Sequence, residues 1–482
     1  MVSLLLIFFA FLCSYFYKKA DLNLVPVLSN LSIPYFLSYF IFVFLSMLFL
    51  IYVLFEKYSV FYFFTDSNSI ILYNSQIQPF YSLNPFSLNL LTIYVFPFIY
   101  VFATITLISV IFALTYNFAE FYSFLFFILI ITFAGFGLFV TDSFALFFFF
   151  YELLLIPSFF ILYKFGKTRR SIEASYSMFF WTQFGALFLI FTFTYLTLRT
   201  GTYNFSSLDK YFFSYFEINF LFLCLLFGFG VKIPIWPFYG WLPKAHVEAS
   251  TNFSIFLSGV LVKFAFFGFL KCLIALQTEP SFIFAYPLLV VGIVDTVPKL
   301  FFQRDLKKLI AYSTVLEMHW LTICVISGHS PLILASFAML ISHAFISTLS
   351  FLLVDSITRR FKTREITEIS GLNYLCPKLF LICLINCQIF LGFPGSIYFI
   401  SEVLFYTFFF DINPITGCIL LFLMYLLAPS FFYKSWLNVM FGFSSFNLLY
   451  SQKDLNSREF LLYVFLCFIV YWLGFTWQSF II

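Results

Sequence analysis

Five titratable residues lie deep inside apolar stretches of this sequence. Glu152 occurs within FFFFYELLLIP, Lys232 within GFGVKIPIWP and Lys263 within LSGVLVKFAFFGFLK. His343 lies within LISHAFISTL, and Glu402 follows LGFPGSIYFIS. Ionisable groups in such surroundings are rare and mark ion or proton pathways. Burial disfavours the charged form of a side chain and a nearby opposite charge favours it, so a Glu–Lys pair that separates releases a proton. These residue types indicate a proton pump or an antiporter half-channel; the alternative is a set of ion pairs that only lock helices together.

Two histidine-bearing segments could extend this chemistry. His343 is either a relay group, because histidine exchanges protons near neutral pH, or a buried histidine whose hydrogen bonds are satisfied. Glu317 and His319 lie in AYSTVLEMHWLTI, and residues two apart do not share a helix face. We expect Glu317 either to relay protons or to pair with Lys263.

The composition explains where these groups must lie. Of the 482 residues, 63% are apolar, 25% are aromatic and only 10% are charged, whereas a soluble domain has about 25% charged residues. So few charges cannot cover a soluble globule, and a net charge of +4 is too small for counterion-driven binding of nucleic acid. The composition excludes a soluble enzyme, a disordered chain and a nucleic-acid binder, and it indicates a polytopic membrane protein.

The apolar runs are too long for barrel strands and predict about fourteen transmembrane helices. We place residues 60–72 in a loop. Stretches rich in Gly and Pro, around Lys232 and before Glu402, predict breaks in helices seven and twelve. Such breaks are typical of transporters with inverted repeats.

Residues 1–120 are expected to form N-terminal transmembrane helices and a long non-matrix loop. Residues 121–482 are expected to form an antiporter-like core with C-terminal helices, and the whole chain is one membrane unit. The predicted spans are 2–17, 36–55, 89–115, 121–140, 143–163, 175–197, 218–243, 253–276, 282–298, 309–327, 332–355, 379–408, 414–432 and 460–480.

The basic residues predict the orientation. With fourteen spans, 19 of the 25 Lys and Arg residues fall in one set of loops and 4 in the other, and Lys232 and Lys263 lie inside spans. The minor set is Lys57, Arg199, Lys210 and Lys271. This asymmetry follows the positive-inside rule, so both termini are expected to face away from the positive side.

Cofactor motifs are not expected. Most of the nine cysteines lie in apolar runs, and the spacing of Cys376, Cys383 and Cys387 fits neither zinc nor iron–sulfur ligation. No G-x-G-x-x-G motif occurs. We therefore expect no flavin, nicotinamide or metal in this chain.

The segment VKIPIWPFYGWLPKAHVEAS (231–250) resembles the VK-x-P-x-x-P-x-H-x-WLP-x-AHVEAP motif of the subunit 4 family of NADH:ubiquinone oxidoreductase, respiratory complex I. RDLKKLIAYSTV (304–315) is similar to the DLK-x-x-IAYSSV segment of that family. The resemblance covers about residues 140–480, and AHVEA distinguishes subunit 4 from its paralogues, subunits 2 and 5. These paralogues are similar to subunits of multisubunit sodium/proton antiporters.

The resemblance implies fourteen helices, with the seventh and twelfth broken, and a role for each deep charge. It implies that Glu152 pairs with and modulates Lys232, which holds a proton. Lys263 is implied as the central lysine, His343 as the relay histidine and Glu402 as the acid toward the neighbouring subunit.

The resemblance also implies a proton-translocating membrane-arm subunit of the mitochondrial inner membrane. Such a subunit has no redox centre, contacts lipids and lies between antiporter-like subunits 2 and 5. Its termini are expected on the intermembrane-space side. A stand-alone cation/proton antiporter subunit is the competing function, and an inert membrane scaffold is a third.

The sequence departs from the pattern of the family in three segments. Tyr239 replaces the histidine before WLP, and Ser250 replaces the proline after HVEA. LEMH (316–319) replaces SHMG, so Glu317 takes the place of a histidine and His319 is added.

Overall fold

The computed structural model describes residues 98–110 apart from Tyr100, 118–276 apart from Lys167, 285–442 apart from Asn413, and 454–476. All of them lie in the compact unit Ile77–Ile482. The predicted spans 2–17 and 36–55 and the loop 60–72 lie outside the described residues. The described residues form helices and no named β-strand, with isolated bridges only between Ser143 and Asn204 and between Asp305 and Glu365. The all-α class is confirmed.

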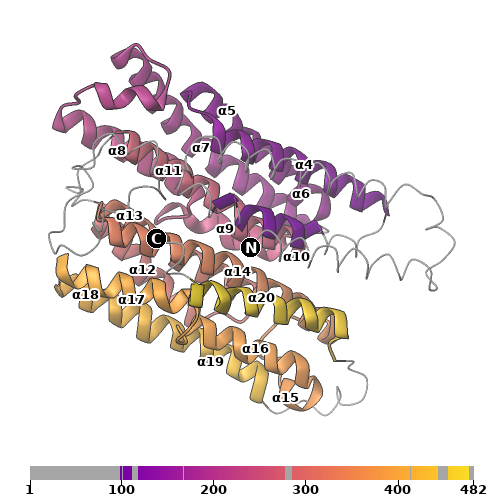
Figure 1. Cartoon of the computed structure of the whole chain (residues 1–482). Coiled ribbons are helices and arrows are strands. Elements are labelled where there is room, and N and C mark those ends of the chain that lie inside the picture. Colours follow the sequence, from indigo (N-terminus) through magenta and orange to yellow (C-terminus); the bar gives the residue numbers. More distant parts are fainter. Residues whose placement is uncertain are drawn as a thin grey trace, which may run out of the picture. The chain divides into compact units, whose positions relative to one another are not determined.

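Ten described helical segments are long and apolar enough to cross a membrane, and Val101–Val110 is a shorter apolar helix. Each predicted span from 121–140 onward corresponds to a helix or to a broken pair of helices (Figure 1). The first group is α4 (Phe118–Val140), α5 (Phe144–Leu153), α6 (Leu155–Phe165), α7 (Arg169–Thr200), η3 (Phe205–Lys210), α8 (Tyr215–Lys232), η4 (Phe238–Gly240), α9 (Trp241–Glu248), α10 (Thr251–Phe256), η5 (Leu257–Leu261) and α11 (Val262–Ala275). The second group is α12 (Ala285–Phe301), α13 (Leu306–Ile326), α14 (Ser330–Phe361), α15 (Leu372–Leu375), α16 (Pro377–Phe390), α17 (Ile397–Ile412), α18 (Pro414–Leu421), η6 (Phe422–Leu427) and α19 (Ala428–Phe441), and α20 (Ser457–Thr476) follows it.

The two groups repeat one order of unusual helices. The third crossing of each is a helix of 32 residues, α7 or α14. The fourth is broken, between α8 and α9 or between α16 and α17, and the fifth contains a π-helical segment, η5 or η6. Because each group crosses five times, the second starts on the opposite side from the first. The order therefore supports the expected inverted repeat.

Local sequence explains where the helices around the site begin and end. The Thr168 hydroxyl accepts the Ser171 amide at the start of α7, and α7 ends at Gly201, which has a φ of 68°. Ser214 and Glu217 form a capping box at the start of α8. Pro234 and Pro237 cannot continue α8, so it ends at Lys232 and leaves that side chain beside a non-helical segment.

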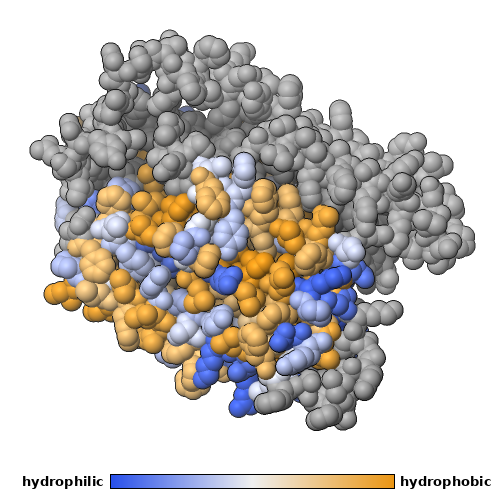
Figure 2. Space-filling model, turned by 60° about the horizontal axis from the view of Figure 1, so that its bottom comes forward, coloured by the Kyte–Doolittle hydropathy of each residue, from blue (hydrophilic) through white to orange (hydrophobic). Residues whose placement is uncertain are grey.

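The outer helices expose many large apolar side chains. On α7, Phe180, Phe184, Leu187 and Phe191 share one exposed face. Figure 2 shows such apolar surface interrupted by compact hydrophilic patches on the described residues. By contrast, α10–α11, α13 and α14 are almost entirely buried. The charged residues on these central helices are therefore held by protein.

The loops expected to be positive meet at one end of the helices. The Arg364 guanidinium donates to the Val247 carbonyl at 2.9 Å and pairs with Asp305 at 2.7 Å. Thr168 donates to Glu248 at 2.7 Å, and Arg360 pairs with Glu459 at 2.7 Å. These contacts join loops from both groups of helices, so the positive-side loops predicted from the sequence share one face. The opposite end carries the Arg199–Glu217 pair.

Candidate functional site

The acid and the lysine next to the first helix break form an ion pair. The Lys232 Nζ lies 3.2 Å from Glu152 Oε1, 3.2 Å from the Tyr151 carbonyl oxygen and 3.5 Å from the centre of the Tyr151 ring. Gln183 of α7 donates to the other carboxylate oxygen of Glu152 at 2.9 Å. Both charged side chains are largely buried. The carboxylate is therefore bound on both oxygens and holds the ammonium next to the break.

A small cavity of about 40 Å³ adjoins this pair. Lys232, Tyr151, Ser158 and Thr182 supply polar groups to its wall. Residues 257, 261, 262 and 264, which flank Lys263, line it as well. Because one water needs at least about 10–15 Å³, this volume holds about three or four waters. The cavity thus lies between the first ion pair and the helix that carries Lys263.

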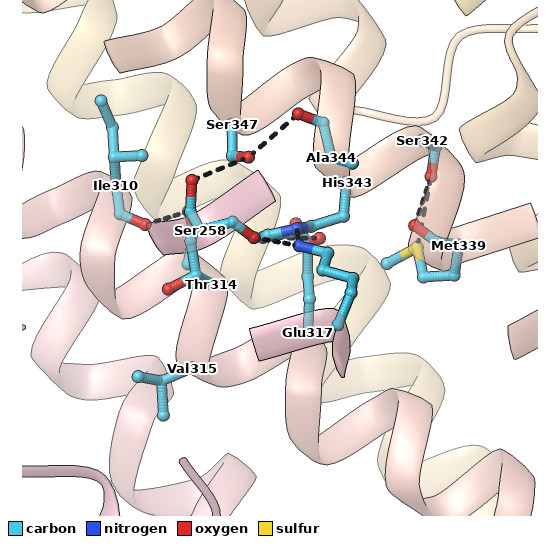
Figure 3. A network of polar contacts seen from close by, with 12 residues as sticks. Ser258, Ile310, Thr314, Val315, Glu317, Met339, Ser342, His343, Ala344 and Ser347 are labelled. Atoms are coloured by element: carbon cyan, nitrogen blue, oxygen red, sulfur yellow. Dashed lines mark hydrogen bonds and ion pairs between the residues drawn. The ribbon is translucent and has the colours of Figure 1, made fainter. Parts of the chain in front are cut away.

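Lys263 and His343 form the second cluster, which is buried between α11 and α14. The Lys263 Nζ lies 2.6 Å from His343 Nδ1 and also donates to the Ser258 carbonyl. Ser258 lies in the π-helical η5, and its hydroxyl contacts the Ser347 hydroxyl at 3.2 Å (Figure 3). Single π-helical turns are frequent at functional sites because they change which backbone groups are free. Here the π turn directs a carbonyl to the lysine.

Glu317 of α13 lies on the far side of the imidazole from Lys263. The Glu317 Oε2 is 3.7 Å from His343 Nε2, so the pair is close enough for an ion pair and too long for a hydrogen bond (Figure 3). Both side chains are fully buried. No direct ion pair joins Glu317 to Lys263 within the described residues, so the structure joins this acid to the histidine instead. The ring of His343 therefore lies between a lysine and a carboxylate.

Glu402 lies on α17, one break further on. It is buried, and its Oε2 has no hydrogen-bond partner among the described residues. The carboxylate lies against Gly392, which has a φ of 68° and where a Cβ would collide with Glu402 Oε2. Glycine thus gives the break both its left-handed turn and the space for the acid. Tyr406, one turn later on α17, also has a buried hydroxyl without a partner in this part of the chain.

The arrangement can pass protons through the imidazole. The ring nitrogens of histidine exchange roles, because one accepts a proton while the other donates one. Lys263 faces Nδ1 and Glu317 faces Nε2. A proton taken from Lys263 at one nitrogen can therefore leave toward Glu317 at the other. Within the described ranges, no group of three or more His, Cys, Asp or Glu side chains is placed to hold a metal ion.

Comparison with known proteins identifies the family of this chain. The family described as "NADH:quinone oxidoreductase/Mrp antiporter, TM" matches residues 141–428. NADH-ubiquinone oxidoreductase chain 4 of Paramecium tetraurelia is 36% identical over 322 residues, which cover 67% of this chain and 68% of that protein. This chain belongs to the chain 4 family of NADH-ubiquinone oxidoreductase.

Two solved structures share the fold of this family member. A chain of respiratory complex I from Thermus thermophilus with bound NADH matches with a TM-score of 0.71 and 21% identity, over 80% of this chain and 81% of that chain. A chain of the Mrp complex from Dietzia sp. DQ12-45-1b matches with a TM-score of 0.71 and 16% identity, over the same shares. At these identities the two structures support the fold alone, and the predicted antiporter-like fold is confirmed.

Two positions at which the chain departs from the family motif are coupled in the structure. The Trp236 amide, inside the break, donates to His319 Nε2 at 2.8 Å, so His319 Nδ1 donates to the Val315 carbonyl at 2.7 Å. The Tyr239 hydroxyl bonds both Asp295 and Lys299, which form an ion pair at 2.7 Å. The added histidine and the replacing tyrosine thus tie the first break to α12 and α13.

This contact predicts that Gly292→Ala destabilises the subunit. A Cβ at Gly292 would collide with the His319 ring and lie 2.9 Å from the Trp236 Cβ. We expect a loss of about 1–3 kcal/mol, as for other overpacked cores. The measurement is the temperature at which half of this chain leaves the purified complex. Gly240→Ala is the control, because nothing lies within 4 Å of its added Cβ; equal behaviour of the two variants would contradict the prediction.

Three site residues were not identified from the sequence. Gln183 is one amide on a long apolar helix, and nothing in its spacing marks it as the partner of Glu152. Ser258 became important only through the π turn. Lys271 was counted with the basic residues of the loops although the predicted span 253–276 contains it, and in the structure it lies within α11 and is buried. A second lysine about two helical turns after Lys263 in one apolar span was the signal that could have identified it.

Proposed function

We propose that this chain is the proton-translocating membrane-arm subunit of respiratory complex I, with Glu152, Lys232, Lys263, His343, Glu317 and Glu402 as its proton-carrying groups. The observation that supports this most is the succession of buried polar groups across both repeats. The Glu152–Lys232 pair adjoins a cavity that reaches the neighbours of Lys263, and Lys263 contacts His343, whose other nitrogen faces Glu317.

The ion pair is the switch in this proposal. While Glu152 holds Lys232, attraction keeps both groups charged. If the pair opens, the Lys232 ammonium loses its counter-charge, and a proton can pass through waters of the cavity toward Lys263. His343 then carries it through the ring to Glu317, and Glu402 receives it at the second break.

The setting of the chain completes the proposal. We place it in the mitochondrial inner membrane, between antiporter-like subunits 2 and 5, with its termini on the intermembrane-space side. Electron transfer from NADH to ubiquinone then takes place in other subunits, and this chain holds no redox centre, flavin, nicotinamide or metal. The free energy released by electron transfer acts on this chain by opening the Glu152–Lys232 ion pair.

A stand-alone cation/proton antiporter is the second candidate, because the Mrp complex shares the fold. The relationship at 36% identity to a chain 4 protein supports complex I instead. An inert scaffold would not need three groups of buried titratable side chains, each of which costs free energy to bury.

The deciding experiment is mass spectrometry of the assembly that this chain belongs to after gentle detergent extraction. We expect flavin and iron–sulfur proteins in the same particle, together with inhibitor-sensitive NADH oxidation. A particle that contains only small hydrophobic antiporter subunits would leave ion transport in place and refute the coupling to electron transfer.

A further inference from the structure

A second buried lysine, Lys271, lies on α11 together with Lys263. Lys271 follows Lys263 by eight residues, so the two are about 12 Å apart along the helix axis. Its side chain is buried. The Lys271 Nζ donates to the Thr141 carbonyl and lies 5.5 Å from the centre of the Phe147 ring and 5.0 Å from that of Phe205. A carbonyl oxygen and ring faces all stabilise a cation.

No acid neutralises this lysine by an ion pair in the part of the chain that the structure describes. Asp142 is next to Thr141, and its carboxylate contacts Ser206: the Ser206 amide donates to Oδ1 at 3.1 Å and its hydroxyl donates to Oδ2 at 2.5 Å. Burial disfavours the charged form of a lysine, and the Thr141 carbonyl, the two ring faces and the nearby Asp142 charge oppose that effect. The Lys271 cation is therefore stabilised without an ion pair, unlike Lys232, which pairs with Glu152.

Lys271 lies between the proposed proton-carrying residues and one end of the helices. Thr141 lies in the turn between α4 and α5, and α6 runs on from α5 to Lys164, near the contact of Thr168 with Glu248 at the basic end. The α4–α5 turn therefore lies at the opposite end, as does η3, which contributes Phe205. Lys271 lies between Lys263 and this end of the helices.

We propose that Lys271 is a fixed positive charge that prevents protons from leaking between Lys263 and the less basic side of the membrane along α11. Fixed positive charges in membrane pores exclude protons and other cations. Two unit charges about 12 Å apart change a protonation equilibrium about tenfold at the effective dielectric constant of a protein interior. The proposal rests on the proton-carrying role of Lys263 proposed above. It adds a residue that stops protons on Lys263 from exchanging passively with the less basic side.

The test uses the intact complex in sealed vesicles, with an imposed membrane potential and no NADH. Lys271→Gln is expected to raise the passive proton leak by about tenfold, with NADH oxidation retained but little stimulated by an uncoupler. Lys271→Arg keeps the charge and is expected to leave the vesicles as tight as the unchanged complex. Lys210→Gln is the matched control, because Lys210 is an exposed lysine at the same end.

Three outcomes would overturn the proposal that Lys271 is a barrier to protons. A leaking Lys271→Arg variant would show that the charge is not what matters, and tight vesicles with slow pumping in that variant would make Lys271 a proton carrier. If Lys271→Gln does not assemble, Lys271→Met and the arginine variant still test the proposal. In the double variant Lys263→Met with Lys271→Gln, the proton leak must disappear. A leak that persists would show that the protons do not pass through Lys263. Pumping by Lys263→Met alone tests the proposed function separately.

Discussion

Replacement of Lys232 by methionine is expected to lower NADH-driven proton transfer at least about tenfold, because a positioned proton-transfer group contributes this much or more. The change removes the ammonium 3.2 Å from Glu152 and leaves that carboxylate with Gln183 as its remaining side-chain partner. Loss of one partner from a buried ion pair also costs about 3–5 kcal/mol of stability. The measurement is acidification of sealed vesicles per NADH oxidised, after confirming that the complex is assembled.

The control for Lys232→Met is Arg199→Met. Arg199 pairs with Glu217 at 3.1 Å, but it lies at the helix ends and is more than half exposed. Exposed pairs contribute about 0–1 kcal/mol, so this variant should pump normally. The double variant Glu152→Gln with Lys232→Met removes the unpaired carboxylate and should assemble better than the single variant, still without pumping. Normal acidification by Lys232→Met would refute the switch role of the pair.

The deep charges could be predicted from the sequence because they violate the composition around them. Glu152, Lys232 and Glu402 are conspicuous in runs of Phe, Leu and Ile, and lipid-facing positions would not retain them. The prolines after Lys232 and the glycines before Glu402 predicted both breaks for an equally direct reason, because such residues cannot continue a helix. The structure confirms both breaks.

The partners of these charges could not be predicted because they depend on helix packing. Residues on different helices meet according to the rotation of each helix, and a nearly uniform apolar sequence gives little sign of that rotation. Gln183 and Ser258 became visible only once α7 and η5 were placed. The same limit left Glu317 with two alternatives, proton relay or pairing with Lys263. In the structure its carboxylate lies 3.7 Å from His343 Nε2, and Lys263 contacts Nδ1 of the same ring.

Lys271 shows a limit of the positive-inside count. It lies near the end of the predicted span 253–276, and it was counted among the four basic residues of the less basic side. In the structure α11 continues to Ala275, and the lysine turns inward to the Thr141 carbonyl. A basic residue in the last turns of a span can therefore report a buried site instead of a loop.

Glu317→Gln is expected to lower proton transfer at least about tenfold, because glutamine keeps the shape of the side chain and cannot accept a proton. The Glu317 carboxylate faces His343 Nε2 at 3.7 Å, whereas Lys263 occupies Nδ1. Without the acid, a proton on the imidazole has no receiving carboxylate beside it and returns to the lysine. Vesicle acidification per NADH oxidised measures the loss, and Glu173→Gln is the control because Glu173 is an exposed acid on α7.

A second substitution at this position separates relay from packing. The motif of the family has histidine where this chain has Glu317, so Glu317→His restores a group that accepts and donates protons. We expect Glu317→His to pump better than Glu317→Gln, although histidine is the larger change in shape. If packing alone mattered, the order would be reversed, since glutamine preserves the volume of the buried side chain. Normal pumping by Glu317→Gln would remove Glu317 from the pathway and require that His343 pass its proton to Glu402 without this acid.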